Sequence, residues 1–463
     1  MGKKTETNWE EGRRMKKQHD FTSGNILKQL IFFSGPIMLT NLLQTSYQVV
    51  DSLWVGNLLG ANALGAVAVS STIVFTVLSF VIGMNNAALT ILSQQKGKSH
   101  STGLKKYLNA FVVLLTFLSM GLGIAGFFLT DWLLAILGTP EEMKELAASY
   151  LRINFLGILF LFGYNFISTV LRSLGDSKTP LLFVVTAVCL NVVLDPLFIS
   201  VFNFGVQGAA YATIISQGTS FIVGMAFILH RRLAPFTIPT FPNWQEIKLI
   251  LNLGIPSGLQ MAVISAGVAA IMSVVTGFSS NVVAGFSAAQ RLDSLLMLPA
   301  HALGTSVSSM AGQNIGAGNW DRVKQIAKYG VLYNFTVMLI VGFFVFLLAD
   351  FGIHLFIKDE QSIAFGTKYL QIIAFCYPFL GINFILNGIV RAAGAMYQVL
   401  VLNILSFWVL RYPLTAIFSG LFGDTGIAIG MGSSFLVSSL IAYLYYRFGK
   451  WRKKELFKKK HGG

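Results

Sequence analysis

The chain has 463 residues, of which 54% are hydrophobic and 11% are charged, and its mean hydropathy is +0.67. This composition excludes a water-soluble globular domain and favours a protein that lies in a lipid bilayer. The net charge of +15 is compatible with nucleic acid binding, but the basic residues are spread over short loops and two tails. We therefore expect membrane lipid, and no nucleic acid, as a partner.

Twelve apolar stretches follow one another along the chain, each near or above the ~20 residues needed to cross about 30 Å of hydrocarbon. We expect them at 27–58, 63–92, 108–129, 146–171, 181–202, 208–229, 247–275, 282–310, 326–348, 363–389, 397–418 and 427–448. The sequence thus predicts an all-α polytopic membrane protein with twelve transmembrane helices. Its expected parts are basic tails at 1–26 and 449–463, lobes at 27–229 and 247–448, and a proline-containing linker at 230–246.

The distribution of Lys and Arg predicts the orientation of the chain. Basic residues near the ends of spans resist translocation, and most of them fall in the two tails and the even-numbered loops. We therefore expect a multi-pass protein of the cytoplasmic (plasma) membrane with both termini in the cytoplasm. The first apolar stretch is too long for a cleavable signal peptide. Cys189 and Cys376 both lie inside apolar spans, so neither a disulfide framework nor a metal cluster is indicated.

The two halves of the chain repeat one another. Gly35-Pro36 in the first stretch corresponds to Gly254-Ile255-Pro256 in the seventh, and the segment around Arg172 corresponds to that around Arg391. Because the matches include Gly, Pro and Arg in one order, a duplication explains them better than chance similarity among apolar helices. Two pseudo-symmetric six-helix bundles are therefore expected.

Helix 1 carries an unusual number of polar residues for a membrane span. Gln44, Tyr47 and Asp51 fall at i, i+3 and i+7, hence on one face, and Asn41 precedes them. An ionisable group in hydrocarbon costs about 2.5 to 3.5 kcal/mol on insertion scales, so Asp51 is a functional candidate by default. Pro36 frees a backbone carbonyl and is expected to kink or hinge the helix.

A second group of polar residues lies on helices 4 to 6. Asn191 and Asp195 share a face of helix 5 at i, i+4, Asn165 and Ser168 lie on helix 4, and Thr213 lies on helix 6. Two carboxylates among amide and hydroxyl oxygens are able to share a proton or to hold Na⁺. The structural alternative is that both acids are exposed at helix ends or pair with buried cations.

The second half lacks acids at the corresponding positions and carries a different set of polar residues. These are Gln290, Arg291 and Asp293 on helix 8 and Arg411 on helix 11. For Arg291 and Asp293 a salt bridge across helices and a contact with substrate both remain open. His301 on the same helix is most simply a hydrogen-bonded packing residue.

Three runs of residues resemble the multidrug and toxic compound extrusion (MATE) transporters. They are Gln44-Thr-Ser-Tyr-Gln-Val-Val-Asp51 with its continuation to Gly56, Gln290-Arg-Leu-Asp-Ser-Leu-Leu-Met-Leu-Pro299, and Gly312-Gln-Asn-Ile-Gly-Ala-Gly318. The resemblance covers nearly the whole chain and is strongest to the archaeal-like, DNA-damage-inducible branch. It implies two six-helix lobes in a V around a central cleft, alternating access, and exchange of substrate for H⁺ or Na⁺. It also implies a coupling site of Asp51, Asn165, Asn191, Asp195 and Thr213.

We therefore expect a secondary active antiporter that exports small amphipathic, often cationic compounds and is not an enzyme. Ions would bind at the acid pair, and Gln44, Tyr47, Asn41 and Ser168 would line the cavity. No cofactor is expected other than H⁺ or Na⁺ as the coupling ion. The one metal site that we expect is a possible Na⁺ site at Asp51, Asp195, Asn191 and Thr213. The chain is expected to act as a monomer. The alternative is a flippase of lipid-linked precursors from the same superfamily. An intramembrane prenyl transferase would need clustered acids such as DDxxD, which the sequence lacks.

Overall fold

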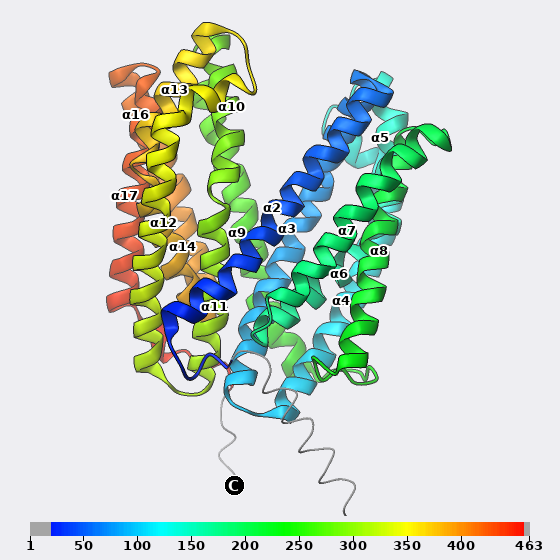
Figure 1. Cartoon of the computed structure of the whole chain (residues 1–463), viewed down its shortest axis with the longest axis vertical. Coiled ribbons are helices and arrows are strands. Elements are labelled where there is room, and N and C mark those ends of the chain that lie inside the picture. Colours follow the sequence, from blue (N-terminus) through cyan, green and yellow to red (C-terminus); the bar gives the residue numbers. More distant parts are fainter. Residues whose placement is uncertain (1–19, 458–463) are drawn as a thin grey trace, which may run out of the picture. The chain divides into compact units, whose positions relative to one another are not determined.

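The computed structural model describes residues 20–457, and this part of the chain is helical with no β-strand (Figure 1). Residues 1–19 of the predicted tail at 1–26 and residues 458–463 of the predicted tail at 449–463 therefore lie outside the described residues. An all-helical fold follows from the medium, because only a helix satisfies its backbone polar groups within a single membrane-spanning segment.

Six helical elements form the first half of the chain. Two of these elements consist of two segments: α5 and α6 follow one another around Gly157, and α7 continues into a short π-helix, η1. The bounds are α2 Ile26–Leu59, α3 Ala61–Gly97, α4 Ser101–Ile136, α5 Glu141–Leu156, α6 Ile158–Ser173, α7 Lys178–Pro196, η1 Leu197–Val201 and α8 Val206–Arg231.

The second half repeats this order of elements. Again the fourth element is a pair, α13 and α14, and the fifth contains a π-helix, η2. The bounds are α9 Trp244–Val275, α10 Ser280–Leu296, α11 Leu298–Gly316, α12 Trp320–His354, α13 Glu360–Ala374, α14 Tyr377–Ala392, α15 Met396–Ile404, η2 Leu405–Arg411, α16 Tyr412–Phe422 and α17 Thr425–Phe448, followed by the short η3 Lys450–Lys453. The prediction of twelve membrane helices in two related halves is confirmed.

Length and hydropathy alone identify fewer spans than twelve. Within residues 20–457, nine helices are long and apolar enough to cross a membrane, and two bent pairs raise the number to eleven. These pairs, α5 with α6 and α13 with α14, bend by 51° and 55°. The twelfth element is α10 with α11, in which Gln290, Arg291 and Asp293 lower the hydropathy of α10. The bends were not predicted from the sequence.

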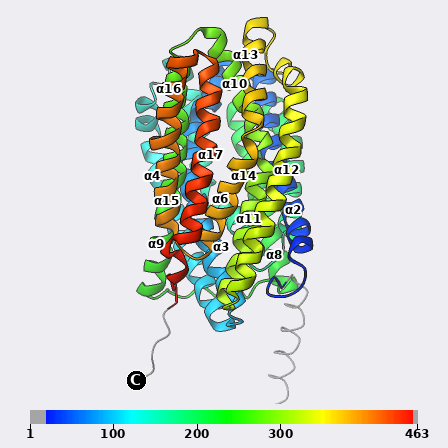
Figure 2. The ribbon, with the colours of Figure 1, turned by 90° about the vertical axis from the view of Figure 1, so that its left-hand side faces the viewer.

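Two compact units divide the chain. Of the described residues, unit 1 comprises Asp20 and 39–252, and unit 2 comprises 21–38 and 253–457. Figure 2 shows α12, α14 and α17, three helices of unit 2, running alongside one another. The division falls inside α2, between Met38 and Leu39 and two residues after Pro36, although the helix itself continues through this proline. The predicted lobes had placed all of helix 1 in the first half, whereas its beginning packs in unit 2.

The beginning of α2 is fixed within unit 2 by hydrogen bonds and by apolar contacts. Arg322 at the start of α12 donates from Nε to the Phe21 carbonyl at 2.8 Å and from Nη2 to the carbonyls of Ser23 and Gly24 at 2.8 and 2.9 Å. Asn314 adds a bond from Nδ2 to the Phe21 carbonyl at 2.9 Å. The buried side chains Phe21, Ile26, Leu30, Phe33 and Ile37 belong to one core with residues of α11, α12 and α14.

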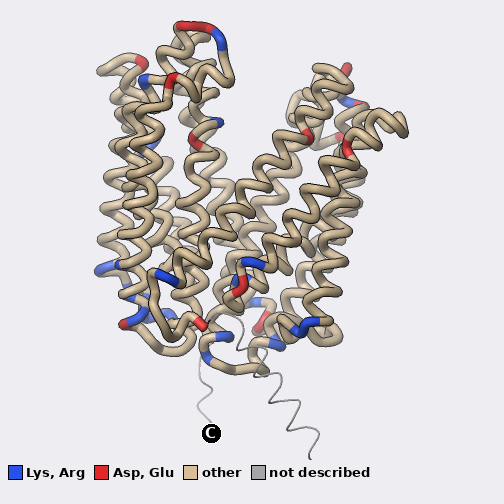
Figure 3. The backbone as a smooth tube through the Cα atoms, in the orientation of Figure 1, with Lys and Arg blue, Asp and Glu red and all other residues tan. Residues whose placement is uncertain are grey.

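Charged residues concentrate at the ends of the helices within each unit. Figure 3 shows long tan stretches along the helices, with Lys and Arg gathered mostly at one end of each unit. This separation is what the cost of placing a charge in hydrocarbon requires. The few charged residues inside the spans are therefore the ones that need a functional explanation.

Gly426 marks a close approach of α16 and α17 in unit 2. A Cβ atom at this position would lie 1.9 Å from the Phe418 carbonyl oxygen, a backbone atom that cannot rotate away. We expect Gly426→Ala to destabilise the protein by about 1 to 3 kcal/mol or more, as overpacking does. Gly420→Ala in α16 is the matched control, because its Cβ would meet nothing within 4 Å. Thermal melting in detergent should show a lower midpoint for Gly426→Ala only, and equal midpoints would contradict this packing.

Candidate functional site: a carboxylate pair in unit 1

The two acids predicted on helices 1 and 5 lie together inside unit 1. Asp51 on α2 is 8% exposed and Asp195 near the end of α7 is fully buried. Their carboxyl groups lie close enough to interact directly. Two like charges at this separation in a low-dielectric interior repel strongly, so the pair favours uptake of a proton or another cation.

Three oxygen atoms of this pair and its neighbour have unfilled hydrogen-bonding capacity. Asn191 Nδ2 donates to Asp195 Oδ1 at 3.0 Å, one turn along the same helix. Asp51 Oδ1, Asn191 Oδ1 and Asp195 Oδ2 are buried and have no partner among residues 20–457. Buried polar atoms are nearly always satisfied, so three orphaned oxygens in one place indicate that something else binds there. Carboxylate and amide oxygens suit a hard cation such as Na⁺, and carboxylates suit a proton.

Both structural alternatives for these acids are excluded by the geometry. Asp51 lies two turns before the end of α2 and is buried, so neither acid is exposed at a helix end. In the part of the chain that the structure describes, no basic side chain forms an ion pair with either acid. No basic side chain of the described residues thus neutralises the pair.

Tyrosine hydroxyls surround the pair. Tyr47, one turn before Asp51, donates to Thr213 Oγ1 of α8 at 3.0 Å, which connects α2 to α8. Tyr150 of α5 is buried and interacts electrostatically with both acids. Sequence reasoning missed Tyr150, because a single tyrosine on an amphipathic helix looks like an ordinary core residue.

The local fold at Asp195 follows from the proline that comes after it. Pro196 ends α7, and the chain continues in the π-helical turn η1. π-helical turns are rare and are found often at functional sites. In the second half, η2 stands at the corresponding place and ends at Arg411, directly before Tyr412-Pro413. The two halves therefore carry residues of opposite charge at their π-helical turns, Asp195 in unit 1 and Arg411 in unit 2.

The other polar residues predicted in the first half form no hydrogen bond with either acid among the described residues. Asn165 and Ser168 donate to carbonyls of their own helix, Leu161 at 2.8 Å and Tyr164 at 3.0 Å. Gln44 donates to the Tyr164 hydroxyl at 3.5 Å. No hydrogen bond of the Asn41 side chain is found among the described residues. Their assignment to the coupling site or to the cavity stays a prediction.

The structure brings together only part of the predicted polar set of the second half. Asp293 accepts hydrogen bonds from Tyr369 at 3.4 Å and from Tyr377. Arg411 is buried and donates to Ser434 Oγ at 3.3 Å. Arg291 is exposed, and no described carboxylate pairs with it or with Arg411. His301 packs its ring against Phe384 at 4.3 Å between centroids.

The sequence and the fold both match known transporters. A model of the MatE family matches residues 36–197 and again residues 256–417, one match in each half. YpnP, a probable multidrug resistance protein of Bacillus subtilis, is 62% identical over 444 residues, covering 96% of this chain and 100% of that protein. YoeA, named likewise and from the same organism, is 29% identical over 93% of this chain and 96% of its own.

A solved structure gives the same result. It is an outward-facing conformation of a multidrug resistance MATE family transporter, with a TM-score of 0.88, 25% identity, and coverage of 94% of this chain and 98% of that one. The two family matches also confirm the internal repeat, because they are of equal length and fall one in each half. The chain therefore belongs to the MatE family and is a multi-pass membrane transporter.

Proposed function

We propose that the chain is a secondary active antiporter that exports small amphipathic, often cationic compounds in exchange for H⁺ or Na⁺. The observation that supports this most directly is the buried Asp51–Asp195 pair, which with Asn191 has three orphaned oxygens and no basic partner between residues 20 and 457. Such a pair attracts a cation when it is charged, and it loses that attraction once an ion has bound. Substrate and ion therefore compete for the same negative charge, which is the requirement for exchange.

The transport cycle that we propose uses α2 as the moving part. Uptake of H⁺ or Na⁺ at Asp51 and Asp195 bends α2 at Pro36, narrows the cavity of the amino-terminal lobe and expels the substrate. The lobes then rock and release the ion on the other side. In support, the division between the two compact units lies just after Pro36, so the helix on either side of the proline packs with different partners. The fixed φ and missing N–H of proline make such a position easy to bend.

The proposed topology places both termini in the cytoplasm of a cell whose plasma membrane the protein spans, and the proposed working unit is the single chain. The support is the distribution of basic residues over the even-numbered loops and tails.

Transport of a cationic dye from vesicles tests the proposed function. The purified protein is reconstituted in liposomes that are loaded with rhodamine 6G. A pH gradient and a Na⁺ gradient are then imposed across the membrane in separate experiments. We expect one of the two gradients to drive dye across the membrane, and empty liposomes to show no such effect. Dye movement that is indifferent to both gradients would contradict antiport. Movement of a fluorescent lipid instead of the dye would indicate a flippase.

A further inference from the structure

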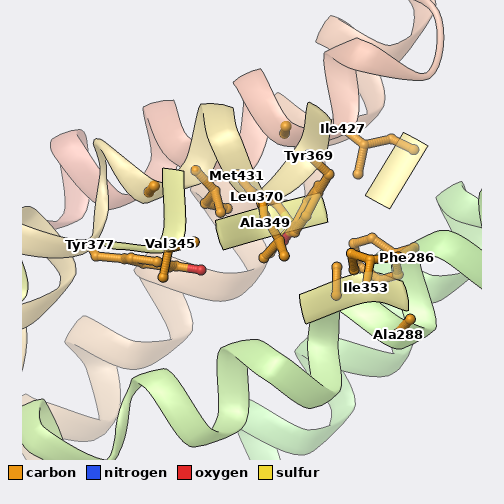
Figure 4. Close-up of a cluster of buried hydrophobic side chains, with 14 of the residues drawn as sticks. Phe286, Ala288, Val345, Ala349, Ile353, Tyr369, Leu370, Tyr377, Ile427 and Met431 are labelled. Carbon is orange, nitrogen blue, oxygen red and sulfur yellow. The ribbon is translucent and has the colours of Figure 1, made fainter. Parts of the chain in front are cut away.

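A second ionisable cluster lies in unit 2, apart from the acid pair. Asp293 on α10 is partly exposed, and its two carboxylate oxygens accept hydrogen bonds from the Tyr369 hydroxyl at 3.4 Å and from the Tyr377 hydroxyl. Figure 4 shows Tyr369 and Tyr377 with Met431 in the apolar core of this unit. Asp293 is therefore a carboxylate held by neutral donors at the border of a dry core.

Arg411, at the end of η2, is a buried cation with unusual neighbours. Its guanidinium carbon lies 3.9 Å from the centroid of the Phe407 ring and 4.6 Å from that of Phe435. Such stacking stabilises a guanidinium, but it covers the faces of the group and leaves its donors to be satisfied at the edge. Within residues 20–457, Nε alone forms a hydrogen bond, to Ser434 Oγ at 3.3 Å, and no carboxylate lies within ion-pair distance.

A short chain of contacts connects the two charges. Tyr369, which donates to Asp293, also lies 3.4 Å from the Met431 sulfur and interacts electrostatically with Arg411. Ser434, the partner of Arg411, donates to the Met431 carbonyl at 2.6 Å. With Asp293 ionised, the cluster therefore carries one negative and one positive charge around Tyr369. With Asp293 protonated, it carries an uncompensated positive charge in a mostly apolar core.

We propose that Arg411 binds the anionic group, a carboxylate or a phosphate, of a transported amphipath, and that proton uptake by Asp293 promotes this binding. This inference rests on the proposed transport function and extends its substrates to anions. A planar guanidinium with free edge donors recognises carboxylate and phosphate oxygens in a bidentate manner. The rings of Phe407 and Phe435 are buried against the guanidinium, so an anion would meet its edge donors.

The reciprocal effect of the two ligands follows from linkage. Protonation of Asp293 removes the negative charge that competes for Arg411, and a bound anion in turn favours the protonated acid. Binding of the anion is therefore accompanied by proton uptake, and its affinity rises as the pH falls, by at most about tenfold per pH unit for one proton. Tyr369 and Tyr377 are the titratable groups that hydrogen-bond to Asp293, and Cys376 and Arg411 interact electrostatically with these tyrosines. Arg291 lies on α10 itself. Among the elements packed against α10, α13 also carries Glu360 and Lys368, α11 carries His301, and α12 carries the mutually paired Asp350 and His354 besides the charged residues of its first turns.

The test uses two fluorescent probes with the same apolar part and opposite charge, pyrenebutyrate and pyrenebutyltrimethylammonium. The intact protein is placed in nanodiscs, and binding of each probe is titrated from mildly acidic to mildly alkaline pH, with empty nanodiscs subtracted. We expect the wild type to bind pyrenebutyrate more tightly as the pH falls, and Arg411→Gln to bind it about tenfold or more weakly at low pH. Binding of the cationic probe should change little in Arg411→Gln.

The Asp293→Asn variant gives the second arm. Because its side chain is neutral at every pH, it should bind pyrenebutyrate tightly throughout and lose the dependence on pH. The matched control is Arg231→Gln, which removes an exposed arginine that lies 5.8 Å over the Phe227 ring. A folded Arg411→Gln with unchanged pyrenebutyrate affinity would overturn the proposal. If Arg411→Gln does not fold, an Asp293→Asn variant that keeps the wild-type pH dependence overturns it instead.

The two proposals fail separately in these experiments. Dye transport that ignores both ion gradients, with the pyrenebutyrate pattern intact, contradicts antiport but keeps the anion site. Ion-driven transport of rhodamine 6G together with pyrenebutyrate binding that is indifferent to Arg411 removes the anion site and leaves antiport in place.

Discussion

Replacement of Asp51 by Asn is expected to reduce ion-driven dye transport by at least about tenfold, because the variant loses one of the two charges that bind the ion. A tenfold effect corresponds to a loss of about 1.4 kcal/mol in coupling free energy. The amide keeps the shape of the side chain and removes the charge that attracts both the ion and the cationic substrate. It also removes the repulsion from Asp195, so the folded protein should be no less stable. The measurement is rhodamine 6G transport in liposomes under the imposed gradient that drives the wild type.

Two further variants make this result specific. Asp195→Asn should cause a loss of similar size, and the double variant should be little worse than either single one, since the acids act as a unit. Glu142→Gln removes an exposed acid of α5 in the same unit and should leave transport unchanged. If Asp51→Asn transports dye with its ion dependence intact, the acid pair is not the coupling site.

The two acids could be identified from the sequence because helix spacing and an apolar context already mark them as unusual. Asn191 and Asp195 are one turn apart on a single helix, and an intramembrane acid such as Asp51 is conspicuous in an apolar sequence. That Asp51 and Asp195 meet is a tertiary fact, which came from the family resemblance rather than from spacing. Tyr150 was not predicted, since nothing in its own helix distinguishes a tyrosine that faces two acids from one that packs.

Two features of the fold were also beyond the sequence. The bends between α5 and α6 and between α13 and α14 occur within apolar stretches that read as single spans. Gly157 at the first bend lies where a Cβ would meet the Ile214 side chain at 2.3 Å, so its reason is a contact with another helix. The beginning of α2 packs in unit 2 because of Arg322 and Asn314, residues almost 300 positions away, which no local pattern reveals.

In unit 2, the aromatic partners of the charged residues were hidden for a similar reason. Tyr369, Tyr377 and Phe435 look like core residues in the sequence, and they are core residues in the structure. Their second role, as donors to Asp293 or as a stacking surface for Arg411, depends on which helices meet. Sequence reasoning found the charges and left the relation between them open.

Replacement of Arg322 by Ala is expected to release the beginning of α2 from unit 2. The guanidinium donates hydrogen bonds to three backbone carbonyls and to Gln29 Oε1 at 3.1 Å. A hydrogen bond from a charged group contributes up to about 3 kcal/mol to stability. Because the group is partly exposed, we expect a total loss of about 2 to 4 kcal/mol in the free energy of unfolding of this unit. Thermal melting should show a clearly lower midpoint.

The same variant tests whether α2 transmits force between its two ends. Asp51 lies in the part of this helix after Pro36, and the contacts with Arg322 lie at the beginning, before Pro36. If bending at Pro36 works against a fixed beginning, Arg322→Ala should slow ion-driven transport about tenfold while ion binding at the acid pair persists. Lys324→Ala is the matched control on the same helix, because Lys324 forms its ion pair with the exposed Asp321 of its own helix, at 2.7 Å. Transport at the wild-type rate in a folded Arg322→Ala protein would show that the cycle does not depend on this anchor.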